Sequence, residues 1–228
     1  VTYLRQVQLD TGTQIFWSST GIFSDVFSNV FTGYLVGSAI MGQWVDVPQT
    51  GNSNIGTLFL QGITPDRIIQ VDASRFYETR IWTRIRSGFP SEVSALIRES
   101  SLSNNEGRQA PGIEQVEDLT GIWQGNDGSV TYLRQVSLDT GIQIFWSSVG
   151  VFSPVFSNIF TGYRVDSGIM GQWVDVPQTF QNQIGTLQLE VINTGTIRQV
   201  ANTAAYATML WTRVRSGFPP AAVKPGNL

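Results

Sequence analysis

The sequence contains one long internal repeat. When it is shifted by about 129 residues, residues 1–90 align with residues 130–219 without a gap, and about 60 of the 90 aligned positions are identical. Identity is lowest in residues 64–78 and in the matching residues 193–207. An ungapped match with change concentrated in one stretch predicts two copies of one packed domain. Each copy has the roughly 90 to 100 residues that suffice to bury a core.

The repeat also sets the expected domain boundaries. In order, we expect a first β-barrel domain at residues 1–90, a linker with one short helix at residues 91–118, a second β-barrel domain at residues 119–220 and a tail at residues 221–228. Residues 119–129 have no counterpart ahead of Val1. Either the chain is trimmed at its N-terminus or the first unit lacks one element. If the first unit lacks that element, the first barrel has seven strands and one open edge.

Short apolar-polar segments separated by turn sequences predict an all-β fold. The Leu-Asp-Thr-Gly stretches around Asp10 and Asp139 are typical turns, in which the aspartate caps its own backbone and the glycine takes a positive φ. The strands predicted in the second copy are residues 121–125, 130–138, 142–148, 155–165, 169–177, 184–192, 196–202 and 206–215. Tight turns between consecutive strands make neighbours antiparallel, so we expect two tandem up-and-down β-barrels of about eight strands each.

The composition excludes several classes of site. The chain has no histidine and no cysteine. Zinc, copper and non-haem iron sites depend on these side chains, and so do nucleophiles of the usual triad type. We therefore expect no metal, no cofactor and no disulfide, and an enzyme would have to use carboxylate, tyrosine, arginine or lysine chemistry.

Net charge and hydropathy limit the kinds of partner that this protein is expected to bind. The net charge is −3, which disfavours a nucleic-acid partner because such proteins need clustered cations. No apolar run approaches the roughly 18 residues of a membrane span. Arginine supplies all basic residues except Lys224, and surface polarity must come mostly from uncharged side chains. We expect a secreted or cell-surface protein, although the composition does not exclude the cytoplasm.

The start of the second copy resembles a known family. The motif Gly121-x-Trp123 on the first strand, with Arg213 or Arg215 on the last, resembles the signature of the calycin group, which includes avidins and lipocalins. The resemblance spans the barrel length of one repeat and rests on a short motif. It implies an eight-stranded barrel in which the tryptophan closes one end with the arginine over it.

The opening of avidin and streptavidin is the most similar part of that group. The resemblance implies polar ligand contacts at Ser148 and at Gly125 or Asn126. However, Trp146 stands where the hydrogen-bonding tyrosine of biotin binders is expected, so biotin recognition does not carry over with the fold.

Strand alternation selects the candidate binding residues. In residues 169–176, one face carries Trp173 and Asp175, and the opposite face is apolar. If the first face points inward, it offers a stacking surface beside a hydrogen-bond acceptor. Asn158 and its counterpart Asn29 either bond backbone at a bulge or touch a ligand. The predicted ligand-binding residues are Trp17, Trp44, Asp46, Tyr132, Trp146, Ser148, Tyr163, Trp173 and Asp175.

Three functions compete. The first is a non-enzymatic binding protein that holds a small polar-aromatic or sugar-like ligand in each barrel, with a glycan as one multivalent partner. The second is a structural or assembly module with filled barrels, in which exposed aromatic residues form homo-oligomers. The third is an isomerase- or cyclase-like barrel enzyme, which needs Asp175 within reach of Tyr163 or Arg134.

Overall fold

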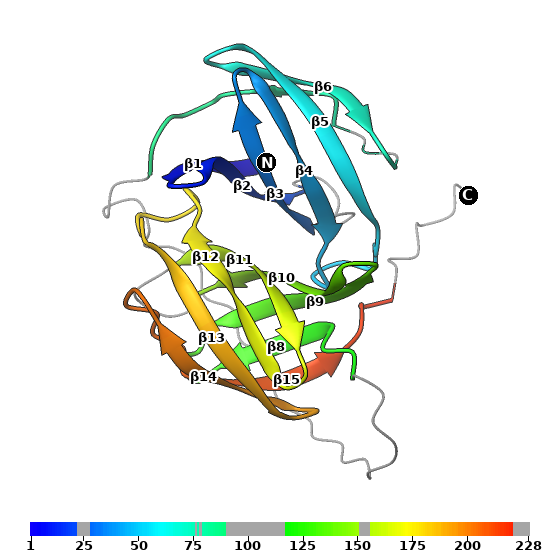
Figure 1. The fold of residues 1–228 in the computed structure, drawn as a ribbon, viewed down its shortest axis with the longest axis vertical. Helices are drawn as coiled ribbons and strands as arrows, with labels where there is room; N and C mark the ends of the chain where they lie inside the picture. Colours follow the sequence, from blue (N-terminus) through cyan, green and yellow to red (C-terminus); the bar gives the residue numbers. More distant parts are fainter. Residues whose placement is uncertain (22–27, 76, 78, 90–116, 151–155, 221–228) are drawn as a thin grey trace, which may run out of the picture.

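Figure 1 shows the computed structural model, which describes residues 1–21, 28–75, 77, 79–89, 117–150 and 156–220. Within these ranges every regular element is a β-strand. The strands of repeat 1 are β1 (Thr2–Leu9), β2 (Gly12–Thr20), β3 (Ser28–Val36), β4 (Ala39–Asp46), β5 (Ile55–Thr64), β6 (Arg67–Ala73) and β7 (Ile81–Thr83). Those of repeat 2 are β8 (Gly121–Gly125), β9 (Val130–Leu138), β10 (Gly141–Val149), β11 (Ser157–Val165), β12 (Gly168–Asp175), β13 (Ile184–Asn193), β14 (Thr196–Asn202) and β15 (Leu210–Ser216).

Repeat 2 is a closed antiparallel barrel. Each strand pairs with the next along the chain, and β8 pairs with both β9 and β15 to close the ring. The predicted up-and-down barrel is confirmed for this repeat. The predicted strand at residues 206–215 begins only at Leu210, because the preceding residues form an irregular segment in which the Tyr206 amide donates to the Ala204 carbonyl oxygen.

Repeat 1 is a curled seven-stranded sheet in the order β1 to β7. It matches repeat 2 strand for strand, except that nothing among the described residues occupies the position of β8. The described part of repeat 1 is thus a seven-stranded half-barrel, the form expected if the first unit lacks the element that precedes Val130 in repeat 2. In this order the edge strands are β1 and β7. Figure 1 shows β1 in blue at one side of the upper repeat.

Two parts of the predicted organisation lie outside the described residues. The short helix expected near the start of the linker falls within residues 90–116, and the tail falls within residues 221–228. In the part of the chain that the structure describes, no helix is long and apolar enough to cross a membrane. The Leu-Asp-Thr-Gly turns are present as predicted, with φ of +119° at Gly12 and +121° at Gly141.

A pair of facing glycines shapes the barrel wall. Gly162 on β11 is paired with Gly171 on β12, and both lie beneath the ring of Phe160. A Cβ atom at Gly162 would come within 2.6 Å of that ring. Because no side chain stands there, Phe160 lies against the sheet and stacks on Trp146, with 4.1 Å between the ring centroids. Gly33, Gly42 and Phe31 repeat the arrangement in repeat 1.

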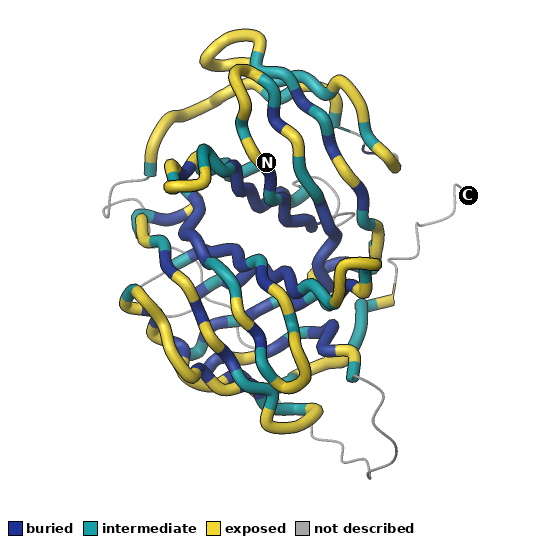
Figure 2. The backbone as a smooth tube through the Cα atoms, viewed as in Figure 1, coloured by how far each residue is buried: buried dark blue, intermediate teal, exposed yellow. Residues whose placement is uncertain are grey.

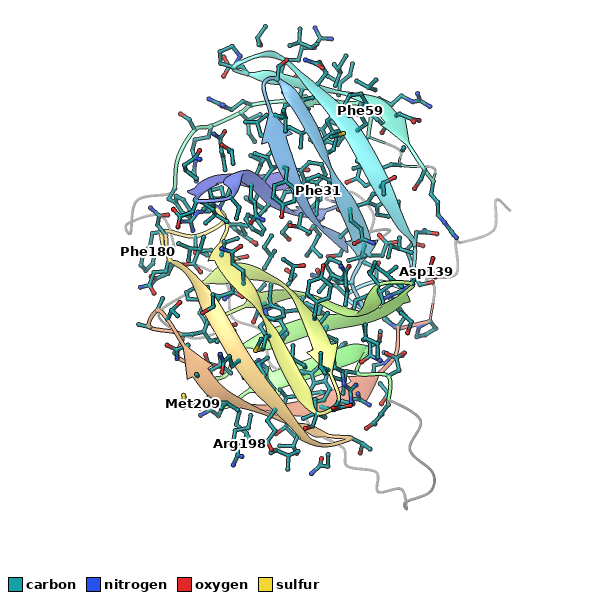
Figure 3. All side chains as sticks on the ribbon, in the orientation of Figure 1. Phe31, Phe59, Asp139, Phe180, Arg198 and Met209 are labelled. Carbon is teal, nitrogen blue, oxygen red and sulfur yellow. The ribbon has the colours of Figure 1, made fainter. Side chains whose placement is uncertain are left out.

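The two repeats pack against each other through the outer faces of their sheets. Buried apolar residues from equivalent positions of both repeats form one cluster between them: Val7, Phe16, Val30, Val45 and Val47 with Val136, Phe145, Ile159, Val174 and Val176. Figures 2 and 3 show this layer as buried backbone and side chains filling the space between the upper and lower sheets. The interface is nearly two-fold symmetric, as expected when the same surface of two like units is buried.

Candidate ligand-binding site

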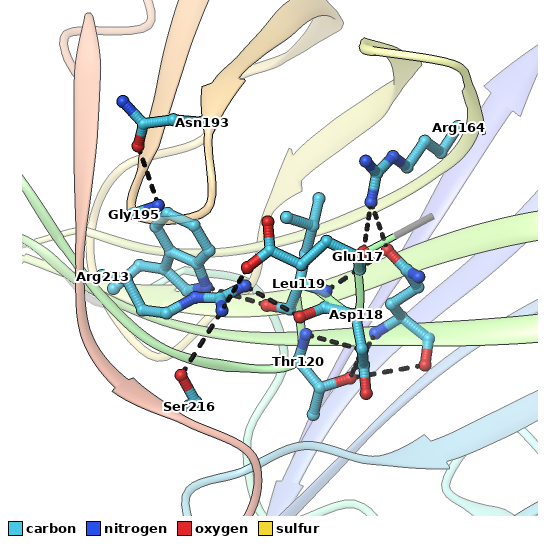
Figure 4. Close-up of polar contacts among 11 residues, drawn as sticks. Glu117, Asp118, Leu119, Thr120, Arg164, Asn193, Gly195, Arg213 and Ser216 are labelled. Atoms are coloured by element: carbon cyan, nitrogen blue, oxygen red, sulfur yellow. Dashed lines mark hydrogen bonds and ion pairs between the residues drawn. The ribbon is translucent and has the colours of Figure 1, made fainter. Parts of the chain in front are cut away.

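One end of the repeat 2 barrel is closed by a stacked tryptophan and arginine. The guanidinium carbon of Arg213 lies 4.6 Å from the ring centroid of Trp123, whose side chain is fully buried. The indole Nε1 donates to the carbonyl oxygen of Leu119 at 3.0 Å. Arg213 also donates to the Glu117 carboxylate at 3.3 Å and to the Asp118 carbonyl oxygen at 2.9 Å (Figure 4). The predicted placement of this arginine over Trp123 is confirmed, and this end of the barrel is plugged.

Aromatic side chains fill the middle of the barrel. Trp211 lies against Trp146 with 5.7 Å between centroids, and Trp173 meets the edge of Tyr206 at 4.7 Å. Each of these four side chains is at most 6% exposed. Phe160 stacks on Trp146, so these five rings form a continuous aromatic surface in the barrel interior.

A buried polar group lies at the end of the barrel opposite the plug. The Oδ1 atom of Asn158 accepts hydrogen bonds from Trp146 Nε1 and from the Tyr206 hydroxyl, both at 3.3 Å. Nearby, the hydroxyls of Thr131 and Ser148 bond each other at 2.8 Å. Burial raises the pKa of Tyr206, so its hydroxyl stays protonated and remains a donor. Asn158 sits in regular register opposite Asp175, so it is not at a bulge.

The turn that follows β8 adds a second polar group at the same end. The Asp127 carboxylate accepts a hydrogen bond from the Ser129 hydroxyl at 2.7 Å and another from the Thr208 hydroxyl at 2.6 Å. Both hydroxyl residues are fully buried. These bonds tie the β8–β9 turn to the irregular segment that leads into β15.

Two buried indoles have a free donor. The Nε1 atoms of Trp173 and Trp211 have no hydrogen-bond partner among the described residues, and the equivalent Trp44 and Trp82 in repeat 1 share this property. A buried donor without a partner costs about 1 to 3 kcal/mol. The same two positions therefore carry unused hydrogen-bonding capacity in both repeats.

Asp175 is buried at the end of β12. Its side chain is 3% exposed, and one carboxylate oxygen accepts a hydrogen bond from the Gln183 amide at 2.7 Å. Burial raises the pKa of Asp175 to about 6, although the hydrogen bond from Gln183 and the charge of Arg5 act in the opposite direction. Arg5 comes from repeat 1 and donates to the carbonyl oxygen of Asp175 at 2.9 Å. The two repeats thus share this corner of the site.

The raised pKa of Asp175 predicts a pH-dependent stability. Its pKa rises from 3.8 to about 6 on folding, so the folded protein holds this proton more tightly than the unfolded chain does. The resulting stability is fully present below about pH 4 and is lost as the pH rises through about 6, with an upper limit of about 3 kcal/mol. We expect Asp175→Asn, which keeps an acceptor for Gln183, to remove this part of the pH dependence.

Urea unfolding at several pH values between about 4 and 7 measures the effect. The matched control is Asp139→Asn, because Asp139 lies exposed in a turn. An unchanged pH slope in Asp175→Asn would show that the carboxyl does not titrate in this range.

The structure distributes the predicted site residues over two environments. Those on the inward face of a repeat are Trp17, Trp44, Asp46, Trp146, Ser148, Trp173 and Asp175. The two tyrosines lie on the outer face. Tyr132 packs against the cluster between the repeats, and Tyr163 is 55% exposed with its hydroxyl accepting a hydrogen bond from Gln143 at 3.0 Å. Neither tyrosine faces the barrel interior.

The side chains that the enzyme alternative needs are not brought together. Tyr163 lies opposite Met170, near the other end of β12 from Asp175. Arg134 donates to the Ser53 carbonyl oxygen of repeat 1 at 3.1 Å and does not contact Asp175. Among the described residues there is also no group of three or more acidic side chains that could hold a metal ion.

Repeat 1 contains a partial copy of the polar site. Asn29 accepts hydrogen bonds from Trp17 Nε1 at 3.4 Å and from the Tyr77 hydroxyl at 3.2 Å. The hydroxyls of Thr2 and Ser19 are 2.6 Å apart, as in the equivalent pair of repeat 2. Burial raises the pKa of Tyr77 to about 12. The counterparts of Asp127 and Ser129 are missing from the described part of this repeat, because they belong to the turn after β8.

Sequence reasoning missed part of this site. Tyr206, Thr208 and Asp127 were not among the predicted residues, although the structure places them around Asn158 and the buried indoles. For Tyr206 a signal exists, because it matches Tyr77 within the stretch where the two copies differ most. An isolated tyrosine in an irregular segment carries no alternation pattern, so its inward direction could not be predicted.

A separate groove runs along the junction of the repeats. It has a volume of about 750 Å³ and lies on the outer faces of the sheets. Tyr34 and Met41 line it from repeat 1, and the equivalent Tyr163 and Met170 line it from repeat 2. All four side chains are at least 50% exposed.

Comparison of the chain with protein-family models, with curated proteins and with solved structures finds no match.

Proposed function

We propose that this protein is a non-enzymatic binding protein whose closed barrel takes a small polar-aromatic or sugar-like molecule at the end opposite the plug. The observation that carries the proposal is the pairing of buried polar groups with an aromatic surface that keeps unused donors. Trp173 and Trp211 each have a buried indole N–H without a partner among the described residues. Both rings contact Tyr206, whose hydroxyl donates to Asn158. A ligand with carbonyl or hydroxyl oxygens would satisfy these donors while its ring stacks on the indoles.

Tyr206 marks the place that the ligand would take. Its ring lies edge-on to Trp173 and close to Trp211, and it comes from the irregular segment before β15 rather than from a strand. Few backbone hydrogen bonds hold such a segment, so it opens at a lower cost than the barrel wall. In the proposed mechanism the Tyr206 ring moves aside and the ligand replaces it against the two indoles.

The resemblance to calycins is consistent with this proposal. The stacking of Arg213 on Trp123 at the plugged end is the arrangement that the resemblance implied. It supports a barrel that is closed at one end and binds at the other. The described part of repeat 1 contains no counterpart of the groups that follow β8, so we assign ligand binding first to repeat 2.

Intrinsic tryptophan fluorescence tests the proposal. We expect a saturable change when the full chain is titrated with a panel of glycans and small heterocycles that includes biotin. Trp173→Phe keeps an aromatic ring but loses the donor, and should weaken binding by about tenfold or more, the effect of one lost hydrogen bond. Tyr206→Ala should bind more tightly than the parent, because the ligand no longer displaces a ring.

The matched control is Trp123→Phe at the plugged end. It also removes one indole, but it should leave the affinity unchanged. A flat response across the panel, in the parent and in Tyr206→Ala, would reject the binding proposal.

A second candidate is the assembly module. It is favoured by the dense contact among the interior rings and by the exposed tyrosine and methionine pairs of the groove. Light scattering distinguishes it, because this function requires an oligomer whereas ligand binding does not.

A further inference from the structure

Among the described residues of repeat 1, a gap of one strand separates β1 from β7. In repeat 2 the same position holds β8, which pairs with β9 on one side and with β15 on the other. The two segments that border the gap, β1 and residues 81–87, have nearly the same sequence as the two strands that border β8 in repeat 2. The identical pairs, repeat 1 first, are Thr2 and Thr131, Leu4 and Leu133, Trp82 and Trp211, Arg84 and Arg213, Arg86 and Arg215, and Ser87 and Ser216.

The residues of these bordering segments are more exposed in repeat 1 than in repeat 2. Trp82 and Leu4 are only half-buried, whereas their counterparts in the closed barrel are at most 2% exposed. Ile85 is 89% exposed, against 55% for the equivalent Val214. The apolar surface that β8 covers in repeat 2 is therefore open in repeat 1.

The last strand shows the same difference. β7 covers only Ile81–Thr83, while β15 covers Leu210–Ser216, although the two sequences differ at only two conservative positions. Arg84 pairs with exposed Asp66 at 3.6 Å, and its side chain is 48% exposed. The matching Arg213 stacks on Trp123 and is 10% exposed. Nearly the same residues thus adopt the closed-barrel arrangement only where a β8 strand is present.

The contacts of β8 define what fits such a gap. A Cβ atom at Gly121 would overlap the carbonyl oxygen of Arg215, so this position requires glycine. Trp123 fills the core beneath the arginine. A Cβ atom at Gly125 would crowd the Asp127 and Ser129 side chains of the following turn. The pattern is therefore Gly-x-Trp-x-Gly, followed by a tight polar turn.

We propose that the gap between β1 and β7 is a binding slot for one extended segment of this Gly-x-Trp-x-Gly pattern. The edge at Val1 already has the register of the closed barrel. Its nitrogen donates to the Thr20 carbonyl oxygen at 2.7 Å, at the place where Val130 pairs with Val149 in repeat 2. A backbone amide could make the same bond.

A second copy of the chain is a poorer occupant. Each copy has two slots and one β8, so exchange of β8 between copies fills one slot only by opening another. The occupant that closes repeat 1 without opening repeat 2 is an additional strand.

Hydrogen exchange on an extended full chain tests the slot. A copy of residues 117–129 is placed directly ahead of Val1, and backbone amides are followed by mass spectrometry. We expect the amides of residues 84–87 to exchange at least about a hundredfold more slowly than in the parent, approaching the rates of residues 213–216 in the same molecule. Repeat 2 serves as the internal reference and should not change.

The control carries the same extension with valine in place of the glycine that corresponds to Gly121. It should leave residues 84–87 as fast as in the parent, because a side chain there would overlap the Arg86 carbonyl oxygen. Equal exchange in the parent and the extended chain would overturn the proposal, as would equal protection by the valine control. Light scattering should show a monomer, and slowing that occurs only in a strand-exchanged dimer would also overturn it.

Discussion

Replacing Trp211 by alanine should destabilise repeat 2 by about 3 to 5 kcal/mol, whereas the same change at Trp82 should cost repeat 1 clearly less. Both tryptophans contact the equivalent tyrosine and tryptophan, with centroid distances of 5.6 to 6.1 Å. They differ in burial, because Trp211 is 2% exposed inside a closed barrel and Trp82 is half-buried beside the gap. Because Trp82 buries less apolar surface than Trp211, its replacement by alanine loses less hydrophobic stabilisation.

Urea unfolding combined with hydrogen exchange can follow the two repeats separately. The two variants are matched controls for each other, since the local sequence around them is nearly identical. Equal losses of stability would mean that β8 does not contribute to the burial of this position.

A second large effect is expected at the junction of the repeats. Val174→Asp would place a carboxylate in the fully buried cluster between the two sheets, where Val174 has 0% exposure. A buried charge without a designed partner costs several kcal/mol, so we expect a loss of about 4 kcal/mol or separation of the two repeats. The barrel interior should keep its packing, because Val174 points away from it.

The control is Met170→Asp on the same outer face of β12. Met170 is 62% exposed at the groove, so its replacement should change stability by no more than about 0.5 kcal/mol. Small-angle scattering together with denaturant unfolding measures both outcomes. If Val174→Asp were as harmless as Met170→Asp, the repeats would not be held together by this face.

The sequence predicted the strands because its local signals agree. The turns at Asp10 and Asp139 carry the glycine that a positive φ requires, and the apolar alternation between turns has the period of a strand. The contact between Trp123 and Arg213 was also predictable, from a short motif at two distant points of the chain. Strand ends were less certain, as at residues 206–209, where Tyr206 points inward from an irregular segment.

The role of each strand face could not be predicted in the same way. Alternation separated Trp173 and Asp175 from Val174, but it did not say which set faces the barrel. Both sets are buried, one in the interior and the other against the second repeat. A strand buried on both faces carries no polar stripe to mark the solvent side. For the same reason Tyr132, on the outer face, was grouped with residues of the interior.

By itself the sequence determined the duplication, the all-β class, the antiparallel order of the strands and the absence of histidine and thiol chemistry. These properties depend on neighbouring residues and on composition, which act before any distant contact forms. Only the tertiary structure decided that the repeats bury their outer faces against each other, and that Asn158, Tyr206 and the indoles meet inside the barrel. It also made Arg213 a plug and left Arg84 exposed, although the two lie in nearly identical sequences, because burial depends on whether a neighbouring strand is present.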